Sequence, residues 1–181
     1  MNVLLVGCGF TSTLTAFLLR SKYPNIHLTL WDKARGPGGR ASVRRGPNET
    51  FVDLGTQFIT TNNSIISKYS VIYNMLISSN NLVPMMCKVI GMRESPDDKH
   101  FIAPNGTSSV VKYLLDNSKV NDIKFGRRIC TILPTGNVKC IDGYEQTFDL
   151  IIITNPIPQI LELECPILQT GVLYYIKNQY R

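Results

Sequence analysis

The stretch VLLVGCGFTSTLTAFLLRSKYPNIHLTLWDKARGPGGR, residues 3–40, decides the fold. It begins with four apolar residues in a row, which is typical of a strand buried on both faces of a parallel sheet. After Gly9 the apolar residues recur at helical spacing, and Pro24 ends that pattern. Residues 26–31 form a second apolar, β-prone run that ends at Asp32. The order strand, glycine turn, helix, strand predicts an α/β fold with a parallel central sheet.

The turn before the helix reads GCGFTS and matches the pattern GxGxxG at Gly7 and Gly9. Those two glycines permit a tight turn and let the backbone approach a pyrophosphate at the helix N-terminus. Ser12 stands where the pattern has its third glycine, so the match is imperfect. A glycine turn without a ligand is the alternative. The context predicts a Rossmann-like FAD/NAD(P)-binding fold.

Two features downstream of the turn narrow the choice of ligand. Asp32 stands where an acid accepts hydrogen bonds from a ribose hydroxyl and repels a 2′-phosphate, although Lys33 and Arg35 leave NADP open. In the GGR loop, Gly39 lets the chain pass close to a cofactor, and Arg40 can bond pyrophosphate oxygens. This loop is not part of a plain NAD fingerprint, so FAD is the predicted cofactor. The alternatives are that Asp32 is only a surface residue at the end of a strand, and that the GGR loop is a flexible loop with an exposed arginine.

The rest of the chain alternates helical and extended patterns. Apolar spacing predicts an amphipathic helix over residues 62–79 and a shorter one from Thr107. The apolar run 148–153 predicts a central parallel strand. Two β-prone runs joined by Pro-Thr-Gly-Asn predict a hairpin within a meander. The two strands of that hairpin are expected at 129–133 and 138–141. Further extended segments are expected at 51–55 and 171–176, and residues 82–92 are expected to form an edge strand broken at Pro84.

Composition excludes several classes of protein. The 181 residues are 44% hydrophobic and 18% charged, as in a globular chain, and no apolar run is long enough for a membrane span. The net charge of +6 comes without a basic stripe or nucleic-acid motif, so no nucleic-acid partner is expected. Five cysteines without a CxxC pair indicate no metal site and favour a reducing, cytoplasmic location. Secretion is the alternative.

Several segments taken together resemble the N-terminal half of the renalase family, which belongs to the amine-oxidase-like FAD proteins. They are VLLVGCGFTSTLTAFLLR, LTLWDKARGPGGR, VDLGTQFIT, FIAPNGTSSVVKYLL and FDLIIITNPIPQIL, in that order. The resemblance implies that FAD is contacted by Gly7, Gly9, Thr11, Asp32, Lys33, Gly39, Arg40, Gln57, Phe58 and the pair Arg128-Ile129.

The resemblance also implies an activity: oxidation of reduced NAD(P) isomers by a flavin, which passes the electrons to O2 and gives H2O2. The partners implied are a small dinucleotide substrate and O2. No catalytic residue is named, because the flavin supplies the chemistry. His27 and His100 are expected to be a strand residue and a surface residue. The alternatives are a flavin monoamine oxidase-like enzyme, an inactive FAD-binding or partner-binding remnant, and a plain NAD-dependent dehydrogenase.

The domain organisation expected from the same resemblance is discontinuous. Residues 1–61 and 101–181 are expected to form an FAD-binding domain, with 62–100 inserted as part of a substrate domain. Proteins of this family are about twice as long as this chain, so the expected fold is an incomplete version in which the remainder of the substrate domain is missing.

Overall fold

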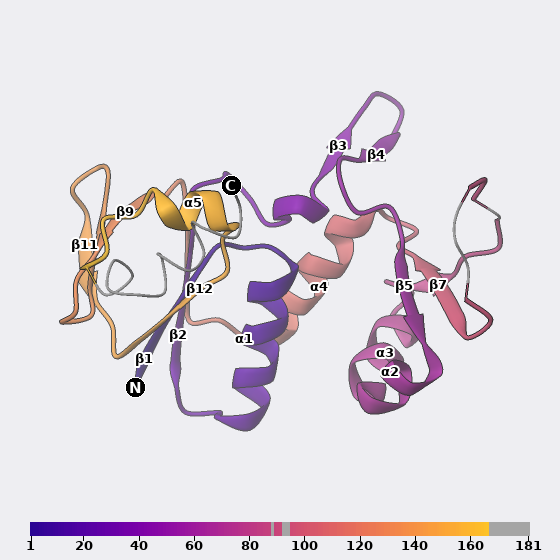
Figure 1. Ribbon diagram of the computed structural model, residues 1–181, viewed down its shortest axis with the longest axis horizontal. Coiled ribbons are helices and arrows are strands. Elements are labelled where there is room, and N and C mark those ends of the chain that lie inside the picture. The colour runs from indigo at the N-terminus through magenta and orange to yellow at the C-terminus, as the bar shows by residue number, and fades with distance from the viewer. Residues whose placement is uncertain (88, 92–94, 167–181) are drawn as a thin grey trace.

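A four-stranded parallel sheet lies at the centre of the computed structural model, which describes residues 1–87, 89–91 and 95–166 (Figure 1). The strand order is β12-β1-β2-β8, and all three pairings are parallel. The strands are β1 (Asn2–Val6), β2 (His27–Asp32), β8 (Asp122–Phe125) and β12 (Leu150–Ile153). Because the strands are parallel, their carboxyl ends share one edge of the sheet, where ligands of such folds bind.

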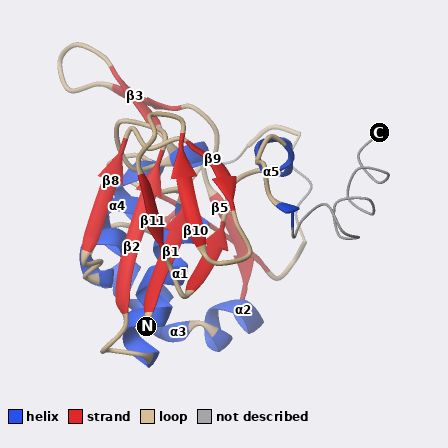
Figure 2. Cartoon of the chain, turned by 90° about the vertical axis from the view of Figure 1, so that its left-hand side faces the viewer, coloured by secondary structure: helices blue, strands red, loops and turns tan. Residues whose placement is uncertain are grey.

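Each face of the parallel sheet is covered by a different layer (Figure 2). Helices α1 (Phe10–Lys22) and α4 (Thr107–Ser118) cover one face, where Val3 and Leu5 are buried. A three-stranded antiparallel sheet covers the other, where Leu4 and Trp31 are buried. Alternate residues of β1 thus enter two cores, which explains its unbroken apolar run. The antiparallel strands are β9 (Ile129–Ile132), β10 (Asn137–Cys140) and β11 (Glu145–Thr147).

A smaller lobe packs beyond the two helices. Its three-stranded antiparallel sheet has the order β5-β7-β6, and two short helices lie against it. Leu82 and Phe101 of the lobe share a hydrophobic core with Val110 and Leu114 of α4. The described residues of the lobe therefore share one apolar core with α4. Its elements are β5 (Ile59–Asn62), α2 (Asn63–Lys68), α3 (Ser70–Ser78), β6 (Val83–Pro84) and β7 (Asp98–Ile102).

The segment between the main domain and the lobe is fixed to the start of α4. It contains the turn η1 (Gly39–Ala41) and a hairpin of β3 (Val43–Arg45) with β4 (Phe51–Asp53). The Asp53 carboxylate accepts hydrogen bonds from the backbone N–H and the hydroxyl of Thr107, at 2.8 and 2.7 Å. Since Gly106 at the N-cap offers no side chain, Asp53 caps α4 from a distant part of the sequence.

The structure confirms the glycine turn between β1 and α1, strand β2 ending at Asp32, and the hairpin of β9 and β10. Two expectations were wrong or incomplete, and one strand of the central sheet was not predicted. The helix over 62–79 breaks at Tyr69, whose φ of −114° and ψ of 32° end α2 and begin α3. Strand β12 is parallel but lies at the edge of the described sheet, with half-buried side chains. Strand β8 was not predicted, because its four residues, DIKF, are too few and too charged to form an apolar run.

Two other expectations concern residues 82–92 and 171–176. Within residues 82–92 the described strand is only Val83–Pro84, at the edge of its sheet, as expected for a strand broken by proline. The strand expected at 171–176 lies outside the described residues. Among the helices that the structure describes, none has the length and apolar character needed to cross a membrane.

Candidate functional site

Two adjoining cavities open where β1, β2 and β12 end. The larger has a volume of about 630 Å³ and extends between α1, the GGR loop and the helices of the lobe. The smaller, of about 170 Å³, lies between the parallel sheet, β9 and the segment that contains α5 (Ile157–Leu161). Both are lined by Gly7, Asp32, Lys33, Asn155 and Gln159. An elongated ligand that runs along this shared wall can occupy both cavities.

The glycine turn places open backbone at the centre of this wall. Gly7 has a φ of +100°, and a Cβ added there would lie 2.9 Å from Oγ1 of Thr154, so only glycine fits. Helix α1 begins at Phe10 with no side-chain cap. The N–H groups of its first turn lack partners within the helix, and with the helix dipole they favour an anion such as a phosphate.

Asp32 is held rigidly beside the turn. One carboxylate oxygen accepts the backbone N–H of Cys8 at 2.5 Å, and the other accepts that of Ala34 at 2.7 Å. Each oxygen keeps a further lone pair for a ligand donor. Burial, with the nearby charge of Asp32 as the second cause, raises the pKa of the Cys8 thiol to about 12. Cys8 therefore stays a neutral, unreactive thiol near neutral pH.

The GGR loop is fastened to the glycine turn by its backbone. The N–H of Gly38 donates to the Cys8 carbonyl at 2.8 Å. A Cβ on Gly39, whose φ is +56°, would lie 3.3 Å from the Cα of Gly9. This close approach brings the exposed Arg40 into the lining of the larger cavity. The arginine and the N-terminus of α1 thus face the same cavity, an arrangement suited to a pyrophosphate.

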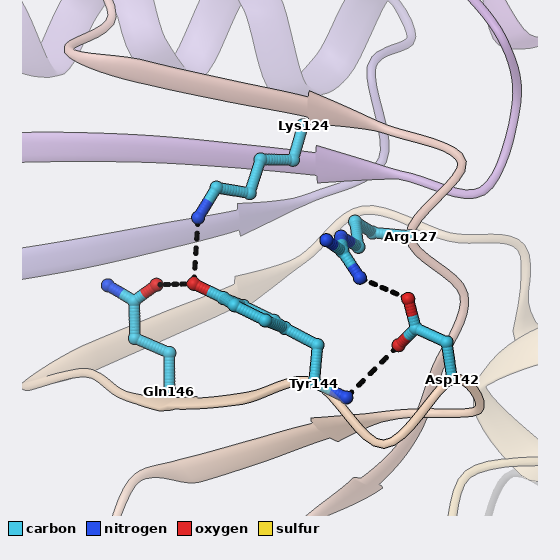
Figure 3. A network of polar contacts seen from close by, with 5 residues as sticks. All are labelled: Lys124, Arg127, Asp142, Tyr144 and Gln146. Atoms are coloured by element: carbon cyan, nitrogen blue, oxygen red, sulfur yellow. Dashed lines mark hydrogen bonds and ion pairs between the residues drawn. The ribbon is translucent and has the colours of Figure 1, made fainter.

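A polar and aromatic network supports the outer wall of the smaller cavity (Figure 3). Arg127, which lines that cavity, pairs with Asp142 and lies 4.4 Å from the ring centroid of Tyr144. The Tyr144 hydroxyl accepts a hydrogen bond from Lys124 at 2.7 Å and donates to Gln146 at 3.1 Å. These contacts fix the guanidinium of Arg127 at the mouth of the cavity.

The larger cavity continues from its polar wall into an apolar chamber. Helix α1 contributes Leu14 and Leu18, and the lobe contributes a set of apolar and aromatic side chains. That set is Ile59, Ile65, Tyr69, Ile72, Tyr73, Leu76 and Leu82. The chamber suits an uncharged, ring-containing part of a ligand.

Most of the predicted cofactor residues come together in these cavities. The larger is lined by Gly7, Gly9, Thr11, Asp32, Lys33, Gly39 and Arg40, and the smaller by Arg128 and Ile129. Gln57 and Phe58 line neither cavity. Gln57 is exposed, and the ring of Phe58 lies edge-on to His100 at 5.9 Å. Their neighbours Thr56 and Ile59 line the larger cavity instead.

Sequence reasoning missed several residues of the lining. Arg127, Tyr69 and Tyr73 carry no local motif and reach the cavities only through tertiary packing. Asn155 could have been found, because it follows a predicted parallel strand and so belongs at the same edge as Asp32.

Comparisons with known proteins agree with this geometry. The family model described as an NAD(P)-binding Rossmann-like domain matches residues 5–73. Renalase from Mus musculus is 36% identical in an alignment of 169 residues that covers 90% of this chain and 49% of the mouse protein. The chain thus spans about half the length of the curated relative that it matches.

Solved structures share the fold at low sequence identity. A protein from Pyrococcus furiosus is 12% identical with a TM-score of 0.64, over 91% of this chain and 61% of that one. A protein from Exiguobacterium sp., provisionally named a protoporphyrinogen oxidase, is 11% identical with a TM-score of 0.67, over 90% and 61%. The predicted Rossmann-like fold is therefore confirmed.

Proposed function

Because this chain belongs to the renalase family and matches about half the length of the mouse protein, we propose that it binds FAD as part of a renalase-type oxidoreductase. The substrate is an isomer of reduced nicotinamide dinucleotide, dihydro-NAD(P), which is oxidised by O2 with formation of H2O2. When bound, a flavin accepts a hydride from the dihydronicotinamide and returns two electrons to O2. Here an isomer of dihydro-NAD(P), one proton and O2 give NAD(P)⁺ and H2O2.

The observation that carries the proposal is the joined pair of cavities with one polar wall. Gly7 and the start of α1 suit the pyrophosphate, and Asp32 suits the adenosine ribose. The smaller cavity, beside Ile129 and Arg128, suits the adenosine end. The apolar chamber suits the ring system at the other end of the dinucleotide. Lys33, Gly39 and Arg40 are the further residues of this wall that we propose to contact FAD. Gln57 and Phe58 remain predicted contacts on the flavin side.

Charge in the larger cavity favours an anionic dinucleotide as its ligand. Among the described residues, the acid in its lining is Asp32, and both of its oxygens already accept backbone hydrogen bonds. The cations in that lining are Lys33 and Arg40. Positive charge therefore prevails in this lining, which favours a ligand with phosphate groups over a cationic one.

The organisation into two parts belongs to the same proposal. Residues 1–61 and 101–181 form the FAD-binding part, and 62–100 contribute to a substrate part. The chamber wall built from α2 and α3 supports this division, because these helices supply apolar side chains rather than phosphate ligands.

The visible absorbance spectrum of the purified chain tests the proposal, with FAD binding titrated in wild type and Arg40→Met. Loss of a charge-assisted hydrogen bond should raise the Kd for FAD about tenfold or more. Arg44→Met, on the exposed part of β3, is the matched control and should bind like wild type. Binding of NAD but not FAD, with no effect of Arg40→Met, would show a nicotinamide nucleotide site instead.

A further inference from the structure

Asn155 is a rigidly placed residue at the boundary of the two cavities. Before it, the hydroxyl and the N–H of Thr154 both donate to the carbonyl of Val6, at 2.8 and 3.0 Å. After it, Pro156 restricts the backbone of the preceding residue to extended conformations. Asn155 is therefore fixed from both sides, with its side chain in the wall that the two cavities share.

Asn155 has a side-chain amide oxygen that accepts no hydrogen bond in the described structure. Its Nδ2 donates to Oε1 of Gln159 at 3.2 Å, which orients the side chain. Its Oδ1 is buried and has no hydrogen-bond partner in the described structure. A Cβ added to Gly7 would lie 3.7 Å from this oxygen, so the free acceptor lies beside the glycine turn. A buried, unpaired acceptor is costly, and a ligand that supplies a donor removes the cost.

The chemistry of a dinucleotide decides which group supplies that donor. Beside the glycine turn, which suits the pyrophosphate, a dinucleotide presents phosphate oxygens, which only accept hydrogen bonds, and sugar hydroxyls, which also donate. Its other donors, the amino and imide N–H groups, lie on the rings at its two ends. We propose that Oδ1 of Asn155 accepts a hydrogen bond from a sugar hydroxyl of the bound dinucleotide, next to the site of Asp32. This inference rests on the proposed function. The hydroxyl comes either from the adenosine ribose or from the sugar chain of the flavin half.

Calorimetric titration of the 181-residue chain distinguishes the two sources. The ligands are FAD, ADP, 2′-deoxy-ADP and 3′-deoxy-ADP, each with wild type, Asn155→Leu and the control Asn117→Leu on the exposed surface of α4. Loss of one neutral hydrogen bond should raise the Kd for FAD about three- to tenfold in Asn155→Leu. The control should match wild type, and thermal melting monitored by circular dichroism checks that each variant folds.

Each pattern of results has a definite meaning. If Asn155→Leu weakens the binding of ADP as well, and has no effect on the binding of one deoxy analogue, the partner is the ribose hydroxyl that this analogue lacks. If it weakens FAD and leaves ADP unchanged, the partner is the flavin sugar chain. Unchanged binding of FAD, or an equal loss with ADP and both deoxy analogues, overturns the inference while leaving the proposed function intact. Failure of folded wild-type chain to bind FAD and ADP overturns both.

Discussion

Gly7 is the residue on which the turn between β1 and α1 depends, since both its positive φ and the nearby Thr154 hydroxyl exclude a side chain. Gly7→Ala should lower the free energy of unfolding by about 1–3 kcal/mol. Gly36→Ala is the matched control, because a Cβ there meets nothing within 4 Å. Chemical denaturation of both variants tests this, and equal stability would contradict it.

The Asp32 carboxylate combines two backbone hydrogen bonds with a free face toward the cavities. Asp32→Asn removes the charge and one acceptor, so the Kd for ADP should rise about tenfold or more. Isothermal titration measures the change. Asp116→Asn, on the exposed face of α4, serves as the control and should leave the Kd unchanged.

Cys8 gives a pH dependence with a defined sign. Its pKa rises from an ordinary value of 9.0 to about 12 in the folded chain, chiefly because of burial. Between these values the unfolded chain loses the thiol proton while the folded chain keeps it, so stability falls as pH rises. Cys8→Ala should flatten this fall in denaturation curves taken from pH 9 to 12, whereas the exposed Cys87→Ala should not.

Among single residues, the sequence predicted those of the cavity lining whose position depends on the local backbone. Gly7, Gly9 and Asp32 follow from a short motif and one strand end, and they lie in the cavities. The free acceptor of Asn155 could not be predicted, because it depends on which side chains surround it after folding.

Among the elements, α4 depends on a cap supplied from β4. Asp53→Ala removes the acceptor for two donors of Thr107 and should cost about 1 kcal/mol of stability. Asp53→Asn keeps one acceptor oxygen and should cost less. Thermal unfolding of the two variants provides the comparison, and equal melting temperatures would argue against the capping role.

The elements were predicted best where the pattern was long or the turn chemistry strong, as for α1 and the hairpin of β9 and β10. Strand β8 has only four residues and two of them are charged, so it lacks the apolar run that marks β1 and β2. The break between α2 and α3 at Tyr69 could not be predicted, because the helical spacing of apolar residues continues across it.

For the whole molecule, the shared core predicts a single unfolding transition. Leu82 belongs to the lobe, yet it packs in one cluster with Val110 and Leu114. Leu82→Ala should destabilise the chain by about 2–5 kcal/mol. The fluorescence of Trp31, the single tryptophan, reports the opposite side of the parallel sheet. Its transition should shift together with that seen by circular dichroism, and two separated transitions would show that the lobe unfolds alone.

The pairing of β1 with β12 joins segments separated by nearly the whole described chain, with Val3 opposite Leu150 and Val6 opposite Ile153. During synthesis β1 therefore leaves the ribosome long before β12, one of its two neighbours in the sheet, exists. Thr154, which closes against Gly7, comes later still. The nascent chain must keep an apolar strand edge from aggregating until then, and pairing over such a separation is intrinsically slow. The nucleotide site is therefore complete only after the residues beyond 150 have left the ribosome.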